Sequence, residues 1–370
     1  MVEGRPGVGK TSFVNVVLWD LFRTATRFPL GTVVEVPGGA SRESFLLTVL
    51  SALVASCRER FGETEIKRST AYAAAEQAVG QIIRESGQAS LSASAFGVGG
   101  GFGRGRSTSV AAPLGVTANS LLELLRPLVQ QIRARGFGGV IVPVNNPDVL
   151  TPVEVISFLN GIRDVTRATP DVHWVFIGNE GLFATLEREM RRLSEAFTGN
   201  PIGLAPLAWS EVREALERRR RHYVLDPATA LPLSDAVAAA VHEAGGGELR
   251  FTLARLGRTA VDFAIRFPSE RQVPDPAAVL LLREWAERTL ARESPLASTE
   301  STVAVALAGR GVLRAKDFAA TGLNSSQRLS AVLGQLERKG WAVRVSHERE
   351  SGYQLSAAAQ FLLRDPTTWL

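Results

Sequence analysis

The pattern of apolar and polar positions over residues 1–203 alternates between short strands and longer helices. Runs rich in β-branched residues, typical of buried strands, occupy residues 32–36, 140–144 and 172–177. Apolar residues three or four positions apart predict helices over residues 44–57, 119–135 and 153–166. Strands that alternate with helices form a parallel sheet covered on both faces. The sequence therefore predicts an α/β domain over residues 1–203.

From residue 204 the strand pattern gives way to helices. Apolar spacing predicts helices over residues 209–221, 233–244, 248–267 and 275–291, which indicates a helical domain over residues 204–296. Residues 297–370 follow a different order, with predicted helices over 301–308 and 315–321 and a third that Asn324 and Ser325 cap. Two predicted strands, 341–345 and 352–355, come next. This order resembles that of a winged helix-turn-helix domain.

Residues 61–113 form an insertion in the α/β pattern. Its centre, residues 90–110, alternates small polar with apolar residues around glycines, which favours two strands joined by a glycine-rich tip. A flexible loop is the alternative. As a projecting hairpin, this segment would offer Arg104 and Arg106 to a protein partner, to DNA or to a neighbouring subunit.

The clearest local motif is a phosphate-binding loop near the start of the chain. It reads Gly4-Arg5-Pro6-Gly7-Val8-Gly9-Lys10-Thr11, a complete G-x-x-x-x-G-K-[ST] pattern, and an apolar helical run follows from Ser12. In such a loop the backbone N–H groups face one anion, the lysine reaches the β- and γ-phosphates, and the next hydroxyl ligates Mg²⁺. The motif therefore predicts that residues 4–12 bind ATP and Mg²⁺.

Two features qualify the loop. A glycine-rich turn with a solvated lysine is the alternative interpretation of the same residues. Only three residues precede Gly4, whereas strands average about five to six residues, so either the reading frame starts late or the strand before the loop is a stub.

Composition narrows the classes of protein that fit. The chain has 370 residues, 45% of them hydrophobic and 21% charged, and no apolar run approaches the roughly 18 residues of a membrane span. A single cysteine, Cys57, excludes internal disulfides, and the absence of a signal peptide makes the cytoplasm the default location. The four histidines are scattered, so protease, metalloenzyme and oxidoreductase functions find no support. A net charge of +5 is compatible with nucleic acid without requiring it.

With these parts in order, the sequence resembles the AAA+ ATPases of the archaeal origin-recognition and replication-licensing type, and related bacterial ATPases. Residues 4–11 are similar to Walker A, residues 140–148 stand where Walker B belongs, and Asn179 resembles the sensor-1 residue. Gly247-Glu248-Leu249-Arg250 is similar to the sensor-2 signature that opens a lid helix. The resemblance implies a P-loop NTPase sheet of AAA+ type, a helical lid over residues 204–296 and a winged helix over residues 297–370.

The resemblance also implies roles for particular residues. It places Lys10, Asn179 and Arg250 around the γ-phosphate of ATP, with Arg255 and Arg258 as fallbacks for Arg250 if the register shifts. Arginines 188, 191 and 192 could reach the nucleotide of a neighbouring subunit in a homo-oligomer, although ordinary surface arginines are the alternative.

The chain departs from the family where aspartate and then glutamate are expected. Asn145 and Asn146 stand at these positions, and Asp148 follows. Asn145 could still hold Mg²⁺ through a water molecule, and Asp148 could substitute for the lost acid, but neutral amides are poor bases. The substitution predicts slow hydrolysis and a nucleotide-controlled switch. The alternative is that the two asparagines only form the turn after the strand.

The winged helix predicts a DNA-binding surface. Its third helix would place Ser325, Ser326, Gln327 and Arg328 near the major groove, and its wing would present Arg344 and Arg349 to phosphates. Because winged helices also dock proteins, two functions remain open. The first is an ATP-dependent switch on duplex DNA, and the second is a nucleotide-gated adaptor that signals through a protein partner.

Overall fold

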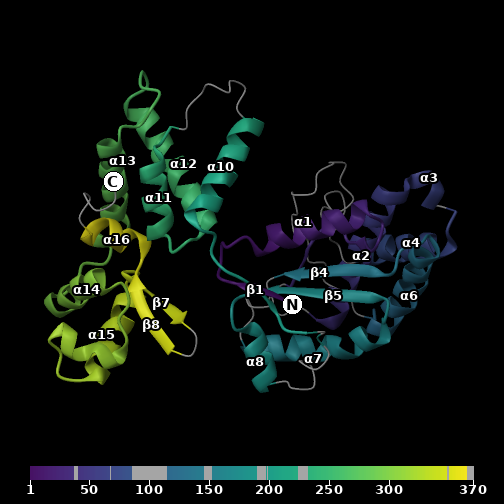
Figure 1. Ribbon diagram of the computed structural model, residues 1–370. Helices are drawn as coiled ribbons and strands as arrows, with labels where there is room; N and C mark the ends of the chain where they lie inside the picture. The colour runs from purple at the N-terminus through teal and green to yellow at the C-terminus, as the bar shows by residue number, and fades with distance from the viewer. Residues whose placement is uncertain are drawn as a thin grey trace. The chain divides into compact units, whose positions relative to one another are not determined.

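The computed structural model describes residues 1–36, 41–66, 68–85, 115–145, 152–189, 197, 199–223, 232–347 and 350–364. The chain divides into two compact units, Met1–Ala205 and Pro206–Leu370 (Figure 1). In the part of the chain that is described, none of the helices combines the length and the apolar character needed to cross a membrane.

The first unit is built on a parallel sheet in the strand order β2-β4-β5-β1-β6, with β3 also paired to β4. The strands are β1 (Val2–Gly4), β2 (Phe28–Pro29), β3 (Val34–Glu35), β4 (Val140–Asn145), β5 (Val172–Gly178) and β6 (Ile202–Leu204). β1 is a stub of three buried residues. It nevertheless lies inside the sheet because β5 and β6 pair with it on its two sides.

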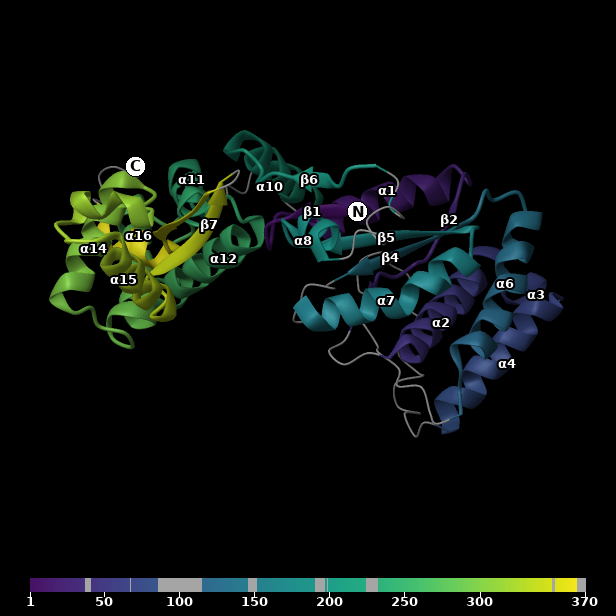
Figure 2. The same ribbon diagram turned by 90° about the horizontal axis from the view of Figure 1, so that it is seen from below.

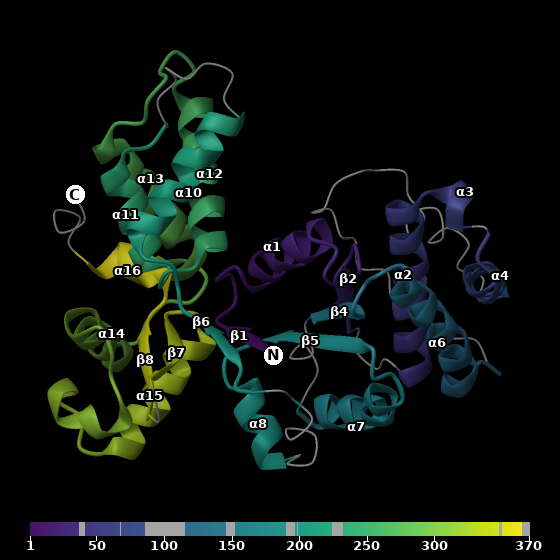
Figure 3. The same cartoon turned by 45° about the vertical axis from the view of Figure 1, so that its right-hand side comes forward.

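Helices cover both faces of this sheet. They are α1 (Lys10–Arg23), α2 (Arg42–Phe61), α3 (Glu63–Ile66), α4 (Thr70–Glu85), α6 (Ala118–Ala134), α7 (Pro152–Ala168) and α8 (Leu182–Glu189). Figure 2 shows α7 and α2 on the near side of β4 and β5, and Figure 3 shows α1 on the side opposite α7. The predicted strands over residues 140–144 and 172–177 are therefore present as β4 and β5, with helices between and around them.

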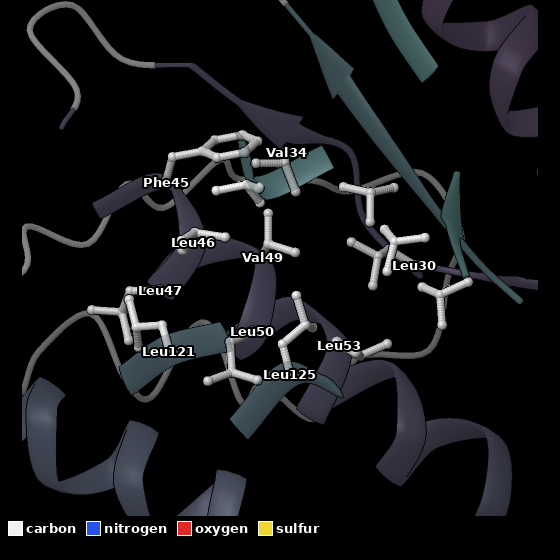
Figure 4. Packing of buried hydrophobic residues seen from close by; sticks show 14 of the residues in the cluster. Leu30, Val34, Phe45, Leu46, Leu47, Val49, Leu50, Leu53, Leu121 and Leu125 are labelled. Atoms are coloured by element: carbon white, nitrogen blue, oxygen red, sulfur yellow. The ribbon is translucent and has the colours of Figure 1, made fainter. Parts of the chain in front are cut away.

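The main core lies between the sheet and α2, α6 and α7. α2 and α6 bury leucines at helical spacing, as Figure 4 shows for Leu46, Leu50, Leu53, Leu121 and Leu125. Each helix has a defined start, because Ser41 accepts a hydrogen bond from the backbone N–H of Ser44, and Thr117 does the same for Ser120. The result is a continuous apolar layer that supports one face of the sheet.

A smaller core lies under α1 on the other face. Val14 and Leu18 of α1 pack with Val2, Ile141 and Ile177 of three neighbouring strands. Because side chains alternate along a strand, Ile141 faces α1 while its neighbours on β4 face the main core. This helix starts directly after the phosphate-binding loop, so the small core holds the loop against the sheet.

Several elements were not predicted from the sequence. α3 and α4 occupy the first part of the segment 61–113, and Tyr72, Ala75, Val79 and Ile83 bury one face of α4. The centre of that segment, residues 90–110 with Arg104 and Arg106, lies outside the described residues. β2 and β6 have two and three residues, which is too short to produce a periodic pattern.

The second unit contains the predicted helices and a winged helix. Its first part comprises α10 (Trp209–Tyr223), α11 (Asp235–Ala244), α12 (Leu249–Arg266), α13 (Asp275–Ala286) and the π-helix η2 (Glu287–Ala291). Its second part comprises α14 (Ser298–Arg310), the 3₁₀ helix η3 (Ala315–Thr321), α15 (Ser326–Arg338), β7 (Ala342–His347), β8 (Glu350–Leu355) and α16 (Ala357–Leu363). β7 and β8 are antiparallel, and Leu313 forms a bridge with Tyr353. The predicted fold class, a parallel α/β sheet with a helical domain and a winged helix-turn-helix, is confirmed.

The two parts of the second unit share one hydrophobic core. The Trp341 indole donates a hydrogen bond to the Ser294 carbonyl at 2.8 Å, and the Gln360 amide donates to the Ala244 carbonyl at 3.1 Å. α16, which was not predicted, packs on α11 and α13 (Figure 3). The predicted boundary between residues 296 and 297 stays a prediction. Because the core is shared, the segment from Pro206 onward packs as one unit.

Candidate functional site

The phosphate-binding loop connects β1 to α1 through a tight turn. Gly9 has φ +100°, a left-handed conformation that favours glycine, and α1 starts at the next residue. Gly4 lies so close to β6 that an added Cβ atom would be 2.7 Å from the Leu204 carbonyl oxygen. Among the described residues, no side chain caps the start of α1 and its first turn has no acidic residue. Its backbone N–H groups and positive dipole end therefore suit an anion.

The Lys10 ammonium group joins the loop to the strand next to β1. It donates hydrogen bonds to the Gly4 carbonyl at 2.8 Å, to the Arg5 carbonyl at 3.1 Å and to the Asn179 Oδ1 at 3.2 Å. Asn179 follows β5, which pairs directly with β1. The structure thus brings together two predicted site residues that are 169 positions apart in the sequence.

A second connection between the same two segments was not predicted. The carboxylate of Glu3, which is buried in β1, accepts hydrogen bonds from the backbone N–H groups of Gly181 and Phe183. Burial raises the pKa of Glu3, and these two hydrogen bonds oppose that rise. Beside it, the Arg5 Nε lies 3.7 Å from the Glu180 carboxylate. An acid within a three-residue apolar strand was the sequence signal for this contact.

At the position where the resemblance leads one to expect a Walker B acid, Asn145 has an acidic neighbour. Its Nδ2 donates a hydrogen bond to the Glu35 Oε1 at 3.0 Å. The two residues are direct partners in the pairing of β3 with β4. Sequence reasoning missed Glu35, because the residues are 110 positions apart and β3 is two residues long.

The other predicted residues of the site have different surroundings. Thr11 and Ser12 occupy the first turn of α1, Thr11 half-buried and Ser12 exposed. Asn146 and Asp148 lie outside the described residues. In the second unit, Arg250 is exposed at the start of α12. Arg255 is buried, its guanidinium 4.3 Å from the centre of the Trp285 ring, and burial lowers its pKa.

This contact inside the second unit engages the guanidinium of Arg255. Of the three arginines predicted for this role, Arg250 and Arg258, both exposed, are therefore the ones that can offer a guanidinium to a ligand.

The residues around the loop fit a magnesium–nucleotide complex. Mg²⁺ prefers oxygen ligands and keeps several of its waters, so one hydroxyl and one or two carboxylate or amide oxygens are sufficient on the protein side. Thr11 offers the hydroxyl, while Asn145 and Glu35 offer oxygens at the carboxyl ends of β4 and β3. Among the described residues, no group of three or more histidine, cysteine or acidic side chains is gathered as for a larger metal cluster.

The surface predicted to bind DNA is formed by side chains on α15 and β7. Gln327, Arg328 and Arg344 are exposed, and Ser326 is half-buried. Ser325 is the N-cap of α15, where its hydroxyl accepts a hydrogen bond from the Arg328 N–H at 3.3 Å. That hydroxyl therefore holds the start of the helix. Arg349 lies outside the described residues.

Comparison with known proteins finds likeness only at the level of structure. No family model matches the chain, and no curated protein sequence matches it. The chain is similar to Cdc6 of Pyrobaculum aerophilum, with 12% identity, 98% of this chain and 84% of that chain covered, and a TM-score of 0.43. It is similar to Aeropyrum pernix Orc1, solved in complex with DNA, with 17% identity, coverage of 99% and 86%, and a TM-score of 0.43.

The ADP form of Aeropyrum pernix Orc2 is also similar, with 11% identity, coverage of 97% and 83%, and a TM-score of 0.46. These proteins are of the type that the sequence resembles. The fold of this chain rests on its own strand order, its phosphate-binding loop and its winged helix. It is a P-loop α/β unit followed by a helical unit that contains a winged helix.

Proposed function

We propose that the chain binds ATP with Mg²⁺ at residues 4–12, hydrolyses it slowly, and acts as a nucleotide-controlled switch on duplex DNA. The observation that carries the proposal is the contact of Lys10 with both the loop carbonyls and Asn179. A lysine at this position can transfer its hydrogen bonds from carbonyl groups to phosphate oxygens, which are stronger acceptors because they are charged. Nucleotide binding would then change what Asn179 contacts.

A switch also needs a path from the phosphates to the rest of the unit. Glu3 and Arg5 both hold the segment after Asn179, the first through backbone N–H groups and the second through Glu180. When Lys10 donates its hydrogen bonds to a phosphate instead, Asn179 loses a hydrogen-bond donor. The segment from Asn179 to the start of α8 can then move. Bound Mg²⁺ would supply positive charge at the phosphate oxygens.

Slow hydrolysis follows from the groups near the end of β4. Asn145 is neutral, and its amide nitrogen is used by Glu35. An amide at this place orients water and does not remove a proton from it. We expect a turnover below about one per second, since typical enzymes run at about 1–1,000 per second.

The DNA part of the proposal is supported by exposed Arg328 at the start of α15 and exposed Arg344 on the wing. Arginine suits both phosphates and guanine edges. Self-association through arginines 188, 191 and 192, and a partner for residues 90–110, stay predictions.

Calorimetric titration of the full chain with a non-hydrolysable ATP analogue and Mg²⁺ tests nucleotide binding. Lys10→Ala is expected to weaken binding by about 100-fold, because a lost charged hydrogen bond costs about 1.5–3 kcal/mol and each 1.4 kcal/mol is tenfold. Lys316→Ala, an exposed lysine on η3, is the matched control and should bind as the unchanged chain does. Equal affinity of the Lys10→Ala variant and the unchanged chain would refute the site.

Titration with duplex DNA in the presence of the ATP analogue or of ADP tests the switch. A coupling of about 1–3 kcal/mol would change DNA affinity about 5- to 150-fold between the two nucleotides. No DNA binding at low salt would instead favour the nucleotide-gated adaptor.

A further inference from the structure

Side-chain alternation places Glu35 and Asn145 on the same face of the sheet. Val34 and Val36, on either side of Glu35, belong to the main core, and so do Val142 and Val144 before Asn145. Since successive side chains of a strand point to opposite faces, Glu35 and Asn145 point away from that core. They point to the face that α1 covers.

This face carries the catalytic part of the proposed nucleotide site. α1 packs on it through Val14 and Leu18, and the first turn of the same helix holds Lys10 and Thr11. Glu35 and Asn145 are also at the carboxyl ends of their strands, which is the edge where ligands of parallel sheets bind. Face and edge together put this pair on the phosphate side of the sheet.

The chemistry of the pair fixes its orientation. An ionised carboxylate can only accept hydrogen bonds, so Asn145 must turn its nitrogen to Glu35 and its oxygen the other way. Glu35 thereby orients the amide oxygen of Asn145, while its own negative charge stays within one hydrogen bond of the position where the family has an aspartate.

We propose that Glu35 supplies the carboxylate of the magnesium–nucleotide site in place of the acid missing from β4, with Asn145 as its positioning residue. The inference rests on the proposed function, because it needs a nucleotide bound at the phosphate loop. With Mg²⁺ bound, Glu35 and the Asn145 oxygen would offer acceptors to the water shell of the ion, a role that suits this ion because it prefers oxygen and retains its waters. The acid has thus moved to the next strand.

The test measures how much Mg²⁺ strengthens binding of ADP to the full chain, as the ratio of the dissociation constants in EDTA and in Mg²⁺. Glu35→Gln is expected to reduce this ratio about tenfold, by removing a charged acceptor worth about 1.5 kcal/mol. Affinity in EDTA should not fall, because without Mg²⁺ the carboxylate of Glu35 only repels the phosphates. Glu123→Gln, an exposed glutamate on α6, is the control and should leave the ratio unchanged.

A charge exchange separates this role from a merely structural one. The double variant Glu35→Asn with Asn145→Asp keeps one acid and one amide in exchanged places, and it should restore most of the lost ratio. Asn145→Asp alone should give a smaller ratio than the exchange, because two adjacent carboxylates resist being charged at the same time. If Glu35→Gln folds poorly, Glu35→Asp can be measured instead, because it keeps the charge on a shorter side chain. Its ratio of dissociation constants should lie between those of the unchanged chain and of Glu35→Gln.

The outcomes distinguish the two proposals. If ADP binds with a clear Mg²⁺ effect that Glu35→Gln and Glu35→Asp both retain in full, the role of Glu35 is refuted and the nucleotide site stands. If the unchanged chain binds no nucleotide in either condition, both proposals are refuted. Restoration by the charge exchange supports the role of Glu35.

Discussion

The proposed nucleotide site and the predicted DNA surface are built from different parts of the chain. At the phosphate loop, the backbone makes the site: glycine conformations shape it, and Lys10 is held by two backbone carbonyls and one side chain. On the winged helix, exposed Gln327, Arg328 and Arg344 make the surface, while Ser325 only caps the helix. A backbone site is tied to folding, whereas a side-chain surface is largely independent of it.

This contrast predicts how each region tolerates substitution. Changes in the loop should alter stability and ligand binding together, because the same backbone serves both. Changes on the winged helix should alter binding and leave stability nearly unchanged, since exposed side chains contribute within about 0.5 kcal/mol to folding.

The largest effect on stability is expected for Gly4→Ala. Its new methyl group would meet the Leu204 carbonyl oxygen at 2.7 Å, a backbone atom that is fixed by the pairing of β1 with β6. Overpacking of this kind costs about 1–3 kcal/mol and should lower the unfolding midpoint by about 3–10 °C. Thermal unfolding followed by circular dichroism measures it.

Gly9→Ala in the same loop is the matched comparison. Nothing lies within 4 Å of the added Cβ, so only the strain of a left-handed φ of +100° opposes it. That strain is about 1–2 kcal/mol, and the fall in the midpoint should be smaller than for Gly4→Ala. A larger fall for Gly9→Ala would contradict the close approach of β1 and β6.

The next effect concerns pH and the buried carboxylate of Glu3. Because burial raises its pKa in the folded protein above the ordinary 4.5, the folded chain holds this proton more tightly than the unfolded chain does. The contribution of Glu3 to stability is therefore most favourable below pH 4.5 and falls as the pH rises through the folded pKa. Glu3→Gln lacks this fall.

Unfolding midpoints of the unchanged chain and of Glu3→Gln, measured from pH 4 upward, check this sign. The difference between the two midpoints should shift in favour of the variant as the pH rises from 4.5 through the folded pKa of Glu3. Glu123→Gln on α6, at an exposed glutamate, is the matched control. Parallel curves for Glu3→Gln would contradict the raised pKa.

What the sequence could predict depends on whether a contact is local or joins distant segments of the chain. The loop, the strands over residues 140–144 and 172–177, and the helices of the second unit as far as α15 follow from patterns among neighbouring residues. Asn179 was predicted because the resemblance gives the order of parts. The fold class therefore follows from periodicity and from one motif.

The contacts that were missed join segments far apart in the chain through very short elements. Glu35 meets Asn145 across 110 positions, and Glu3 meets the N–H of Phe183 across 180. Each acid lies in a strand of two or three residues, where alternation has no length in which to appear. The strand order is needed to see that the acid at position 35 stands beside the amide at position 145.

The smallest effect per substitution is expected on the winged helix, where a single exposed side chain carries each contact. For the full chain bound to duplex DNA, affinity should fall with salt by a log–log slope of about −0.9 for each phosphate contacted. Arg344→Ala should flatten that slope by about one unit at every sequence tested, because on the proposed surface the wing would meet phosphates. Arg328→Ala should instead weaken the preference among sequences, by about 1–3 kcal/mol if its guanidinium reads a guanine.

Arg271→Ala, an exposed arginine before α13, is the control for lost charge alone, and unfolding midpoints of all three variants should match the unchanged chain. Equal slopes for Arg344→Ala and the unchanged chain would show that the wing is not part of the DNA surface. A winged-helix variant whose unfolding midpoint falls as far as that of Gly4→Ala would contradict the distinction between a backbone site and a side-chain surface.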